Sequence, residues 1–187
     1  KNEMYGQIIA TTMFVDIIGF STITQSLAKY GKEGIEVLNK ILYEVFNPAI
    51  DEVHNNSGFV SSFEGDGFTS VFPEPANTHT VCQTALHISE AIRSSNPQKL
   101  KFDSCDFHVR IGLSHGPVDW GIVGSVDYST FYFKGSPIEN CAFLQKKCPD
   151  GKILLDQNLF RKIGEEIYCE SYKENYVLTG CKQKLNS

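Results

Sequence analysis

The segment TTMFVDIIGFSTI, from Thr11 to Ile23, places one carboxylate, Asp16, directly after a run of mostly apolar residues. The apolar run over residues 8–15 has the length and composition of a buried strand. After Asp16 the chain passes Gly19 and enters a helix, and the free N–H groups at a helix N-terminus suit a phosphate chain. The segment therefore predicts an acid at the end of a strand, beside a turn that binds anions.

A long helix and a hairpin are predicted after this segment. Apolar residues recur at three- and four-residue spacing between residues 35 and 53, which gives one apolar stripe. The sequence NNSG at 55–58 ends the helix in turn residues. Two short apolar runs follow, 59–63 and 68–72, and the intervening EGDG at 64–67 predicts a hairpin with glycine where positive φ is needed.

The rest of the chain adds further helices and strands. Helices are predicted over 78–94 and 138–147, and a strand over 107–113. The stretch GPVDWGIVGS at 116–125 predicts a second strand, and the tail at 152–180 predicts a strand, a short helix and two closing strands. Strands interleaved with three long helices predict an α+β fold, with helices packed on a mostly antiparallel sheet.

The length of 187 residues, with 41% hydrophobic and 21% charged residues, predicts a single globular domain over residues 1–187. Within it, we expect residues 1–7 to be an N-terminal lead-in and residues 181–187 to be a tail. Because the sequence begins with Lys1 and not with Met, we expect it to be a piece of a longer protein.

Charge and cysteine spacing exclude several classes of function. The net charge of −5 argues against a nucleic-acid partner, since such surfaces neutralise phosphates with clustered Lys and Arg. Six cysteines without a C-x-x-C pair predict neither a zinc site nor a disulfide framework, and favour reduced thiols in a cytoplasmic protein. No apolar run approaches the ~18 residues of a membrane span, and no signal peptide opens the chain, so we expect no direct membrane contact.

Two acids are candidates for one shared site. Asp16 ends a predicted strand and Asp66 lies in the predicted hairpin turn, and a hairpin turn and a strand end can be neighbours. Two adjacent carboxylates repel each other unless a cation lies between them, and oxygen-only ligands favour Mg²⁺, Mn²⁺ or Ca²⁺. Structural roles stay open for each acid alone: Asp66 as a turn former before Gly67, and Asp16 as a helix N-cap.

Three longer motifs stand out: FVDIIGFSTIT at 14–24, GFVSSFEGDGFTSVF at 58–72 and VRIGLSHGPVDWGIVGS at 109–125. In residues, order and separation they resemble the class III nucleotidyl cyclases, the adenylate and guanylate cyclase catalytic domain. This resemblance implies a ferredoxin-like βαββαβ core, extended to the mostly antiparallel sheet. The resemblance extends from about residue 8 to 180 and includes the closing GKILLDQNLFRKI at 151–163.

The resemblance implies a domain that works as a dimer, with active sites at the interface. Catalytic Asp16 and Asp66, together with the backbone carbonyl of Ile17, would hold two Mg²⁺ or Mn²⁺ ions. The ribose 3′-hydroxyl of a nucleoside triphosphate would attack the α-phosphate in line, which gives a 3′,5′-cyclic nucleotide and pyrophosphate. On the base rate among similar proteins, ATP is the expected substrate.

The phosphate-binding residues implied by the resemblance follow the first acid. The amides around Gly19, Phe20 and Ser21 would contact the triphosphate, and Arg110 matches a basic family position that reaches the phosphates. Arg110 has an alternative reading as a solubility residue on an edge strand.

The sequence departs from the family pattern at four positions. In the base pocket, Ser62 stands where adenylate cyclases have lysine and guanylate cyclases have glutamate, and Tyr132 occupies the second base-reading position. Glu139 replaces an asparagine that orients the ribose, and Phe143 replaces an arginine that stabilises the transition state. Neither replacement donates a hydrogen bond to the developing charge, and nearby Lys146 is either a partial substitute or a solvated helix charge.

The metal-binding residues match the family, whereas the base-pocket and transition-state residues do not. This pattern resembles the first, metal-bearing domain of tandem cyclases such as the bicarbonate-regulated soluble adenylyl cyclases. The expected partner is therefore another cyclase homology domain, in a heterodimer or tandem, while a homodimer would be weak or inactive. One alternative is a catalytically degenerate regulatory domain that binds a metal nucleotide or a second domain without turnover alone. Another is an unusual base specificity set by Ser62 and Tyr132.

Several aromatic and polar residues stay ambiguous. Trp120 either stacks on a base or packs, and His115 is either a general base or a polar residue beside a turn. Tyr128, Phe131 and Tyr132 fall in a predicted hairpin arm, where exposed aromatic side chains would suit a dimer interface.

Overall fold

The computed structural model describes residues 4–94, 98–99, 104–125 and 127–183. Two long antiparallel strands form its centre, β1 (Met4–Ile18) and β6 (His108–Gly124). They pair along their whole length, from Met4 opposite Ile122 to Ile18 opposite His108. Residues 10–15 of β1 are buried without interruption, as expected for a central strand whose two faces are both covered.

Within the described residues, eight strands form one sheet in the order β2-β3-β1-β6-β8-β10-β9, and β7 pairs with β6. The remaining strands are β2 (Phe59–Glu64), β3 (Gly67–Pro73), β7 (Ser129–Lys134), β8 (Lys152–Leu155), β9 (Ile167–Tyr172) and β10 (Asn175–Cys181). Only β6 and β8 pair in parallel among these strands. The order β2-β3-β1-β6 is that of a ferredoxin-like core, so the α+β prediction is confirmed.

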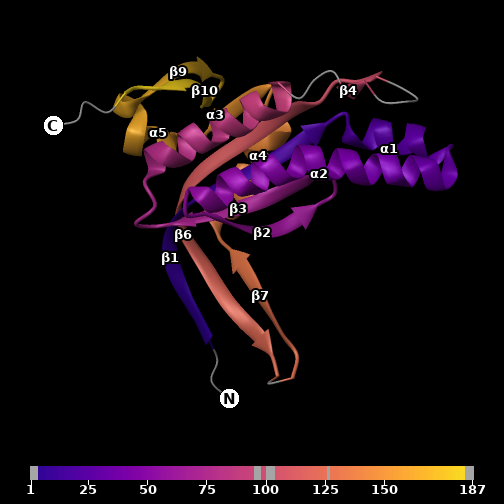
Figure 1. Ribbon diagram of the computed structural model, residues 1–187. Helices are drawn as coiled ribbons and strands as arrows, with labels where there is room; N and C mark the ends of the chain where they lie inside the picture. The colour runs from indigo at the N-terminus through magenta and orange to yellow at the C-terminus, as the bar shows by residue number, and fades with distance from the viewer. Residues whose placement is uncertain (1–3, 95–97, 100–103, 126, 184–187) are drawn as a thin grey trace.

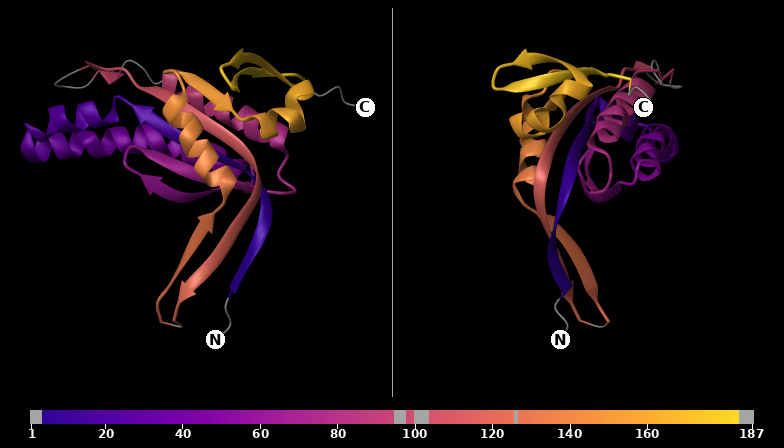
Figure 2. Two further views of the ribbon diagram at one scale, coloured as in Figure 1. Left: turned by 180° about the vertical axis from the view of Figure 1, so that it is seen from behind. Right: turned by 90° about the vertical axis from the view of Figure 1, so that its left-hand side faces the viewer.

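Helices cover both faces of the sheet (Figure 1, Figure 2). On one side, α1 (Phe20–Ala28), α2 (Gly31–Asn55) and α3 (Thr78–Ser94) pack with the sheet in the largest apolar cluster. On the other side, α4 (Ser136–Lys147) crosses β6 and β1. The short α5 (Gln157–Ile163) connects β8 to the closing hairpin β9–β10. Separately, β4 (Gln98–Lys99) and β5 (Ser104–Cys105) pair in a two-stranded antiparallel sheet.

The outer half of the β1–β6 pair, with β7, projects beyond the helices as an arm (Figure 1). Large apolar and aromatic side chains on this arm are exposed, among them Tyr5, Tyr128 and Phe131, whose exposed fractions are 70%, 82% and 58%. The sequence prediction of exposed aromatic residues in a hairpin arm is therefore correct in its location and exposure.

The strand boundaries differ from the prediction at two places. Residues 107–113 and 116–125 were predicted as separate strands, but β6 is continuous because β1 pairs with it through Gly116 and Pro117. Residues 4–7, predicted as a lead-in, belong to β1, since residues 119–122 of β6 pair with them. Among the described residues, no helix has the length and apolar character needed to span a membrane.

Candidate functional site

The structure brings Asp16 and Asp66 together at one end of the sheet. The register of β1 with β3 places Asp16 opposite Gly67, the residue after Asp66. The N–H of Ile17 donates to the backbone oxygen of Asp66 at 3.1 Å. The end of strand β1 and the β2–β3 turn are therefore neighbours.

The glycines on each side of Asp66 allow this approach. Gly65 has φ of +65°, a conformation that favours glycine in a tight turn. A Cβ at Gly67 would lie 2.7 Å from the backbone oxygen of Val15, so a side chain there would push β1 away. The sequence EGDG thus sets the distance between the hairpin turn and the end of β1.

The electrostatic environment of Asp16 favours a bound cation. Burial and then the charge of Asp66 raise the pKa of Asp16 above its usual range. The charge of Arg110 and a hydrogen bond from Gln145 lower that pKa. A cation between the two carboxylates would relieve both the repulsion and the loss of hydration.

The donor set fits a hard divalent cation. Asp16, Asp66 and the backbone carbonyl of Ile17 offer oxygen atoms only, as Mg²⁺ and Mn²⁺ prefer. The described residues contain no group of three or more His, Cys, Asp or Glu side chains arranged to hold a metal ion. A metal would therefore take its remaining ligands from water and from substrate phosphates, which is common for Mg²⁺.

The turn after Asp16 leads into helix α1. Gly19 is its N-cap with φ of 97°, and a Cβ there would lie 2.8 Å from the backbone oxygen of Asp106. The first N–H groups of α1, at Phe20 and Ser21, point out of the helix start and are available in principle to an anion. The Ser21 hydroxyl donates to Oδ2 of Asp66 at 2.7 Å, an additional contact that the sequence did not predict.

Arg110 lies on the same end of the sheet. It is opposite Asp16 in the β1–β6 register, and its Nε and Nη2 contact Oδ1 of Asp150 at 2.8 and 2.7 Å. The alternative reading of Arg110 as an edge-strand residue is wrong, because β6 has β1 on one side and β8 on the other. The guanidinium is one-third exposed, and it lies near enough to Asp16 to lower the pKa of that carboxyl.

A residue that the sequence did not single out completes this cluster. Gln145 on α4 donates from Nε2 to Oδ2 of Asp16 at 2.6 Å, and the residue is only 6% exposed. No motif marks it, because the contact depends on how α4 crosses the sheet.

The four departures from the family pattern lie elsewhere, on β2, β7 and α4. The Ser62 hydroxyl contacts Oε1 of Glu64 at 3.4 Å, and Tyr132 covers Gly121 on the neighbouring strand. Glu139 and Phe143 are one turn apart on α4. Phe143 is 54% exposed, and Lys147 lies over its ring with Nζ 4.0 Å from the centroid.

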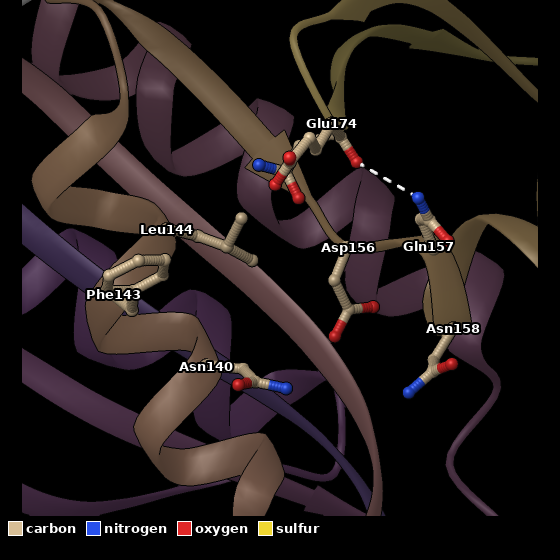
Figure 3. A pocket seen from close by; sticks show the side chains of 8 residues that line it. Asn140, Phe143, Leu144, Asp156, Gln157, Asn158 and Glu174 are labelled. Carbon is tan, nitrogen blue, oxygen red and sulfur yellow. Dashed lines mark hydrogen bonds between the residues drawn. The ribbon is translucent and has the colours of Figure 1, made fainter.

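A cavity of about 270 Å³ lies beside the outer part of α4. Figure 3 shows Asn140, Phe143 and Leu144 of α4 on one side, with Asp156 and Gln157 at the start of α5 on the other. Asp156 is buried and acts structurally, since it accepts hydrogen bonds from the Ser114 hydroxyl and from the N–H of Leu159. This cavity is separate from the carboxylates at the end of β1.

The ambiguous residues have structural contacts. Trp120 packs against Gly6, where a Cβ would lie 3.0 Å from the indole Nε1. His115 contacts the Thr11 hydroxyl through Nδ1 at 3.0 Å, far along β6 from Arg110. The thiols of five cysteines are free: Cys82, Cys141, Cys148, Cys169 and Cys181. Burial raises the pKa of Cys141 to about 12, as expected for an unreactive core thiol.

Comparison with known proteins supports the sequence resemblance. A family model, the adenylate and guanylate cyclase catalytic domain, matches residues 3–185. The uncharacterized protein Rv1318c of Mycobacterium tuberculosis is 27% identical over 156 residues, which cover 82% of this chain. The chain spans only 27% of the length of that relative.

Two solved structures share the fold over nearly the whole of both chains. The guanylyl cyclase domain of the RhoGC fusion protein from the aquatic fungus Blastocladiella emersonii has a TM-score of 0.77 at 19% identity, covering 97% of this chain and 99% of its own. The adenylyl cyclase CyaB from P. aeruginosa has a TM-score of 0.73 at 18% identity, covering 98% and 100%. Since one is a guanylyl and the other an adenylyl cyclase, the fold does not distinguish the two bases.

Proposed function

The chain belongs to the adenylate and guanylate cyclase catalytic domain family, and from this premise we propose that it is the metal-bearing half of a nucleotidyl cyclase. The reaction is the conversion of a nucleoside triphosphate, ATP first, to a 3′,5′-cyclic nucleotide and pyrophosphate. The domain works with two Mg²⁺ or Mn²⁺ ions at an interface with another cyclase homology domain.

The observation that carries this proposal is the adjacency of Asp16 and Asp66. These acids are fifty residues apart in the chain, yet the β1–β3 register and the Ile17 to Asp66 backbone hydrogen bond bring them to one place. Burial and repulsion by Asp66 raise the pKa of Asp16, so keeping both acids ionised in this place is unfavourable unless a cation offsets their charge.

The residues around the two acids divide the work of binding and positioning. Asp16, Asp66 and the Ile17 carbonyl hold the metal ions, while the amides of Phe20 and Ser21 bind the triphosphate at the start of α1. Arg110 adds positive charge beside the phosphates from β6. Bound metal ions would lower the pKa of the ribose 3′-hydroxyl and neutralise the leaving pyrophosphate.

The partner domain supplies what this chain lacks. Glu139 and Phe143 offer no hydrogen-bond donor to the transition state, and removing one such donor reduces turnover by a factor of about 10²–10³. A complementary domain with lysine, asparagine and arginine at the corresponding positions would complete one active site. We place the complex in the cytoplasm, where nucleoside triphosphates and reduced thiols occur together.

The test is a cyclase assay with ATP, GTP, CTP and UTP in Mn²⁺. The purified chain is expected to be weak or inactive alone and to form cyclic nucleotide when mixed with a domain that carries the three missing side chains. Absence of product from all four nucleotides, alone and with such a partner, would rule out the catalytic role.

The second candidate function is a regulatory domain that keeps the metal–nucleotide site without turnover. Phe143 favours this alternative, because it stands where the family has arginine. The residue is 54% exposed, its ring contacts Nζ of Lys147, and it provides no hydrogen-bond donor. Tight, Mn²⁺-dependent binding of a nonhydrolysable triphosphate without product from any partner would support it over catalysis.

A further inference from the structure

We propose that Gln145 is a positioning residue of the metal site, whose buried amide fixes the orientation of the Asp16 carboxylate for cation binding. The proposal rests on the proposed function, since it assumes that Asp16 binds the metal. It goes beyond that function because it assigns a role at the metal site to a residue of α4, a helix that provides none of the proposed metal ligands.

The close approach of α4 to the central strand places Gln145 beside Asp16. Gly112 of β6 lies directly under α4, and a Cβ there would lie 2.8 Å from the backbone nitrogen of Gln145 and would collide with the backbone oxygen of Cys141. The absence of a side chain at Gly112 therefore lets the helix backbone rest on the sheet. The Thr12 hydroxyl also donates to the backbone oxygen of Pro137 at 2.7 Å, which fixes the first turn of α4 on β1.

The hydrogen bond itself is short and partly buried. Nε2 of Gln145 is 2.6 Å from Oδ2 of Asp16, and Gln145 is 6% exposed. An ionised carboxylate only accepts hydrogen bonds, so the NH₂ group of the amide must face it. A charge-assisted hydrogen bond from a side chain held by packing restricts the rotation of the carboxylate.

This contact has a specific consequence for a cation. With Oδ2 held by Gln145, the other oxygen of Asp16, Oδ1, is left to bind metal. The neutral amide stabilises the negative charge of Asp16. A lysine at this position would add a positive charge that competes with the cation, and the amide does not. Residues that orient a metal ligand in this way typically raise metal affinity by about 10- to 100-fold.

The experiment measures Mn²⁺ affinity by electron paramagnetic resonance, with Mn²⁺ alone and with 3′-deoxy-ATP, which lacks the attacking hydroxyl. Gln145→Met keeps the length of the side chain and removes the donor, and Gln145→Asn keeps the amide but shortens its reach. Both variants are expected to bind Mn²⁺ about 10- to 100-fold more weakly than the unaltered chain. Gln157→Met, an exposed glutamine of α5, is the matched control and should bind Mn²⁺ like the unaltered chain.

Thermal unfolding in metal-free buffer separates positioning from a structural role. A lower melting temperature with unchanged Mn²⁺ affinity in both Gln145 variants would overturn the proposal. Asp16→Asn calibrates the assay: if it abolishes Mn²⁺ binding while Gln145→Met and Gln145→Asn do not weaken it, only the role of Gln145 is wrong. If the unaltered chain binds no Mn²⁺ even with 3′-deoxy-ATP, or if Asp16→Asn changes nothing, the metal site and the role of Gln145 are both wrong.

Discussion

Two regions of the domain differ in how their polar side chains are supported. In the carboxylate region, each charged group has a partner: Gln145 for Asp16, Ser21 for Asp66, and Asp150 for Arg110. In the departure region, made of Ser62, Tyr132, Glu139 and Phe143, the contacts are a 3.4 Å hydrogen bond and ring packing. The difference is that charge-bearing hydrogen bonds hold the side chains of the carboxylate region, whereas those of the departure region lack such support in these contacts. The proposed function explains it, because only the carboxylate region would have to hold metal ions.

The two acids provide the largest expected effect in this comparison. Asp16→Asn and Asp66→Asn should each reduce Mn²⁺-dependent turnover in the presence of a complementary domain by at least about 10²–10³-fold, because each removes a metal ligand. Assays of cyclic nucleotide formation measure this loss. The control is Asp127→Asn, an exposed acid in the β6–β7 connection, and equal activity of all three variants would contradict the site.

Repairing the departure region should produce a gain. The double substitution Glu139→Asn with Phe143→Arg restores the donors that the family has at these positions, so we expect homodimer turnover to rise by about 10²-fold. The reaction is followed with ATP and with GTP. If the repaired chain still binds Mn²⁺ and nucleotide but gains no activity, the prediction is contradicted, because groups other than Glu139 and Phe143 would then limit the reaction.

Ser21 tests whether the side-chain partners in the carboxylate region matter. Ser21→Ala removes the 2.7 Å hydrogen bond to Asp66 and keeps the backbone amide for the triphosphate. We expect Mn²⁺ affinity to fall by about threefold to tenfold, less than for the loss of a ligand, since this contact is exposed to solvent. Titration of Mn²⁺ measures the effect, and Ser94→Ala, at the end of α3, serves as the matched control.

His115 lies outside both regions and reports on the fold alone. Burial, then the charge of Lys162, lowers the pKa of His115, while Glu74 and Asp156 oppose this and Thr11 contacts the ring. The unfolded chain therefore takes up a proton at higher pH, so stability is complete above about pH 6.5 and declines as the pH falls below that value.

Urea unfolding measures this pH effect. The free energy of unfolding should fall between pH 7.5 and 5.5 as the unfolded chain takes up the proton that folded His115 disfavours. His115→Gln should flatten that part of the curve without changing Mn²⁺ affinity at pH 7.5. A change in Mn²⁺ affinity in this variant would mean that the two regions are coupled through the sheet.

The sequence predicted local features because their signals are local. The apolar stripe between residues 35 and 53 predicted helix α2, and the EGDG turn predicted the β2–β3 hairpin. Continuity of β6 through Gly116 and Pro117 was not predicted, because glycine and proline are read as strand breaks. Pairing with β1 over fifteen residues of β6, from His108 to Ile122, overrides that local preference.

By itself, the sequence determined the family and the α+β class, and it located Asp16 at a strand end and Asp66 in a hairpin turn, since these depend on motifs and on the period of apolar residues. Only the tertiary structure decided that Ser21 supports Asp66, that Asp150 holds Arg110 and that Gln145 reaches Asp16. The physical reason is that such contacts join residues up to 129 positions apart. Their distances are set by register and by the packing of α4 on Gly112, which no local pattern contains.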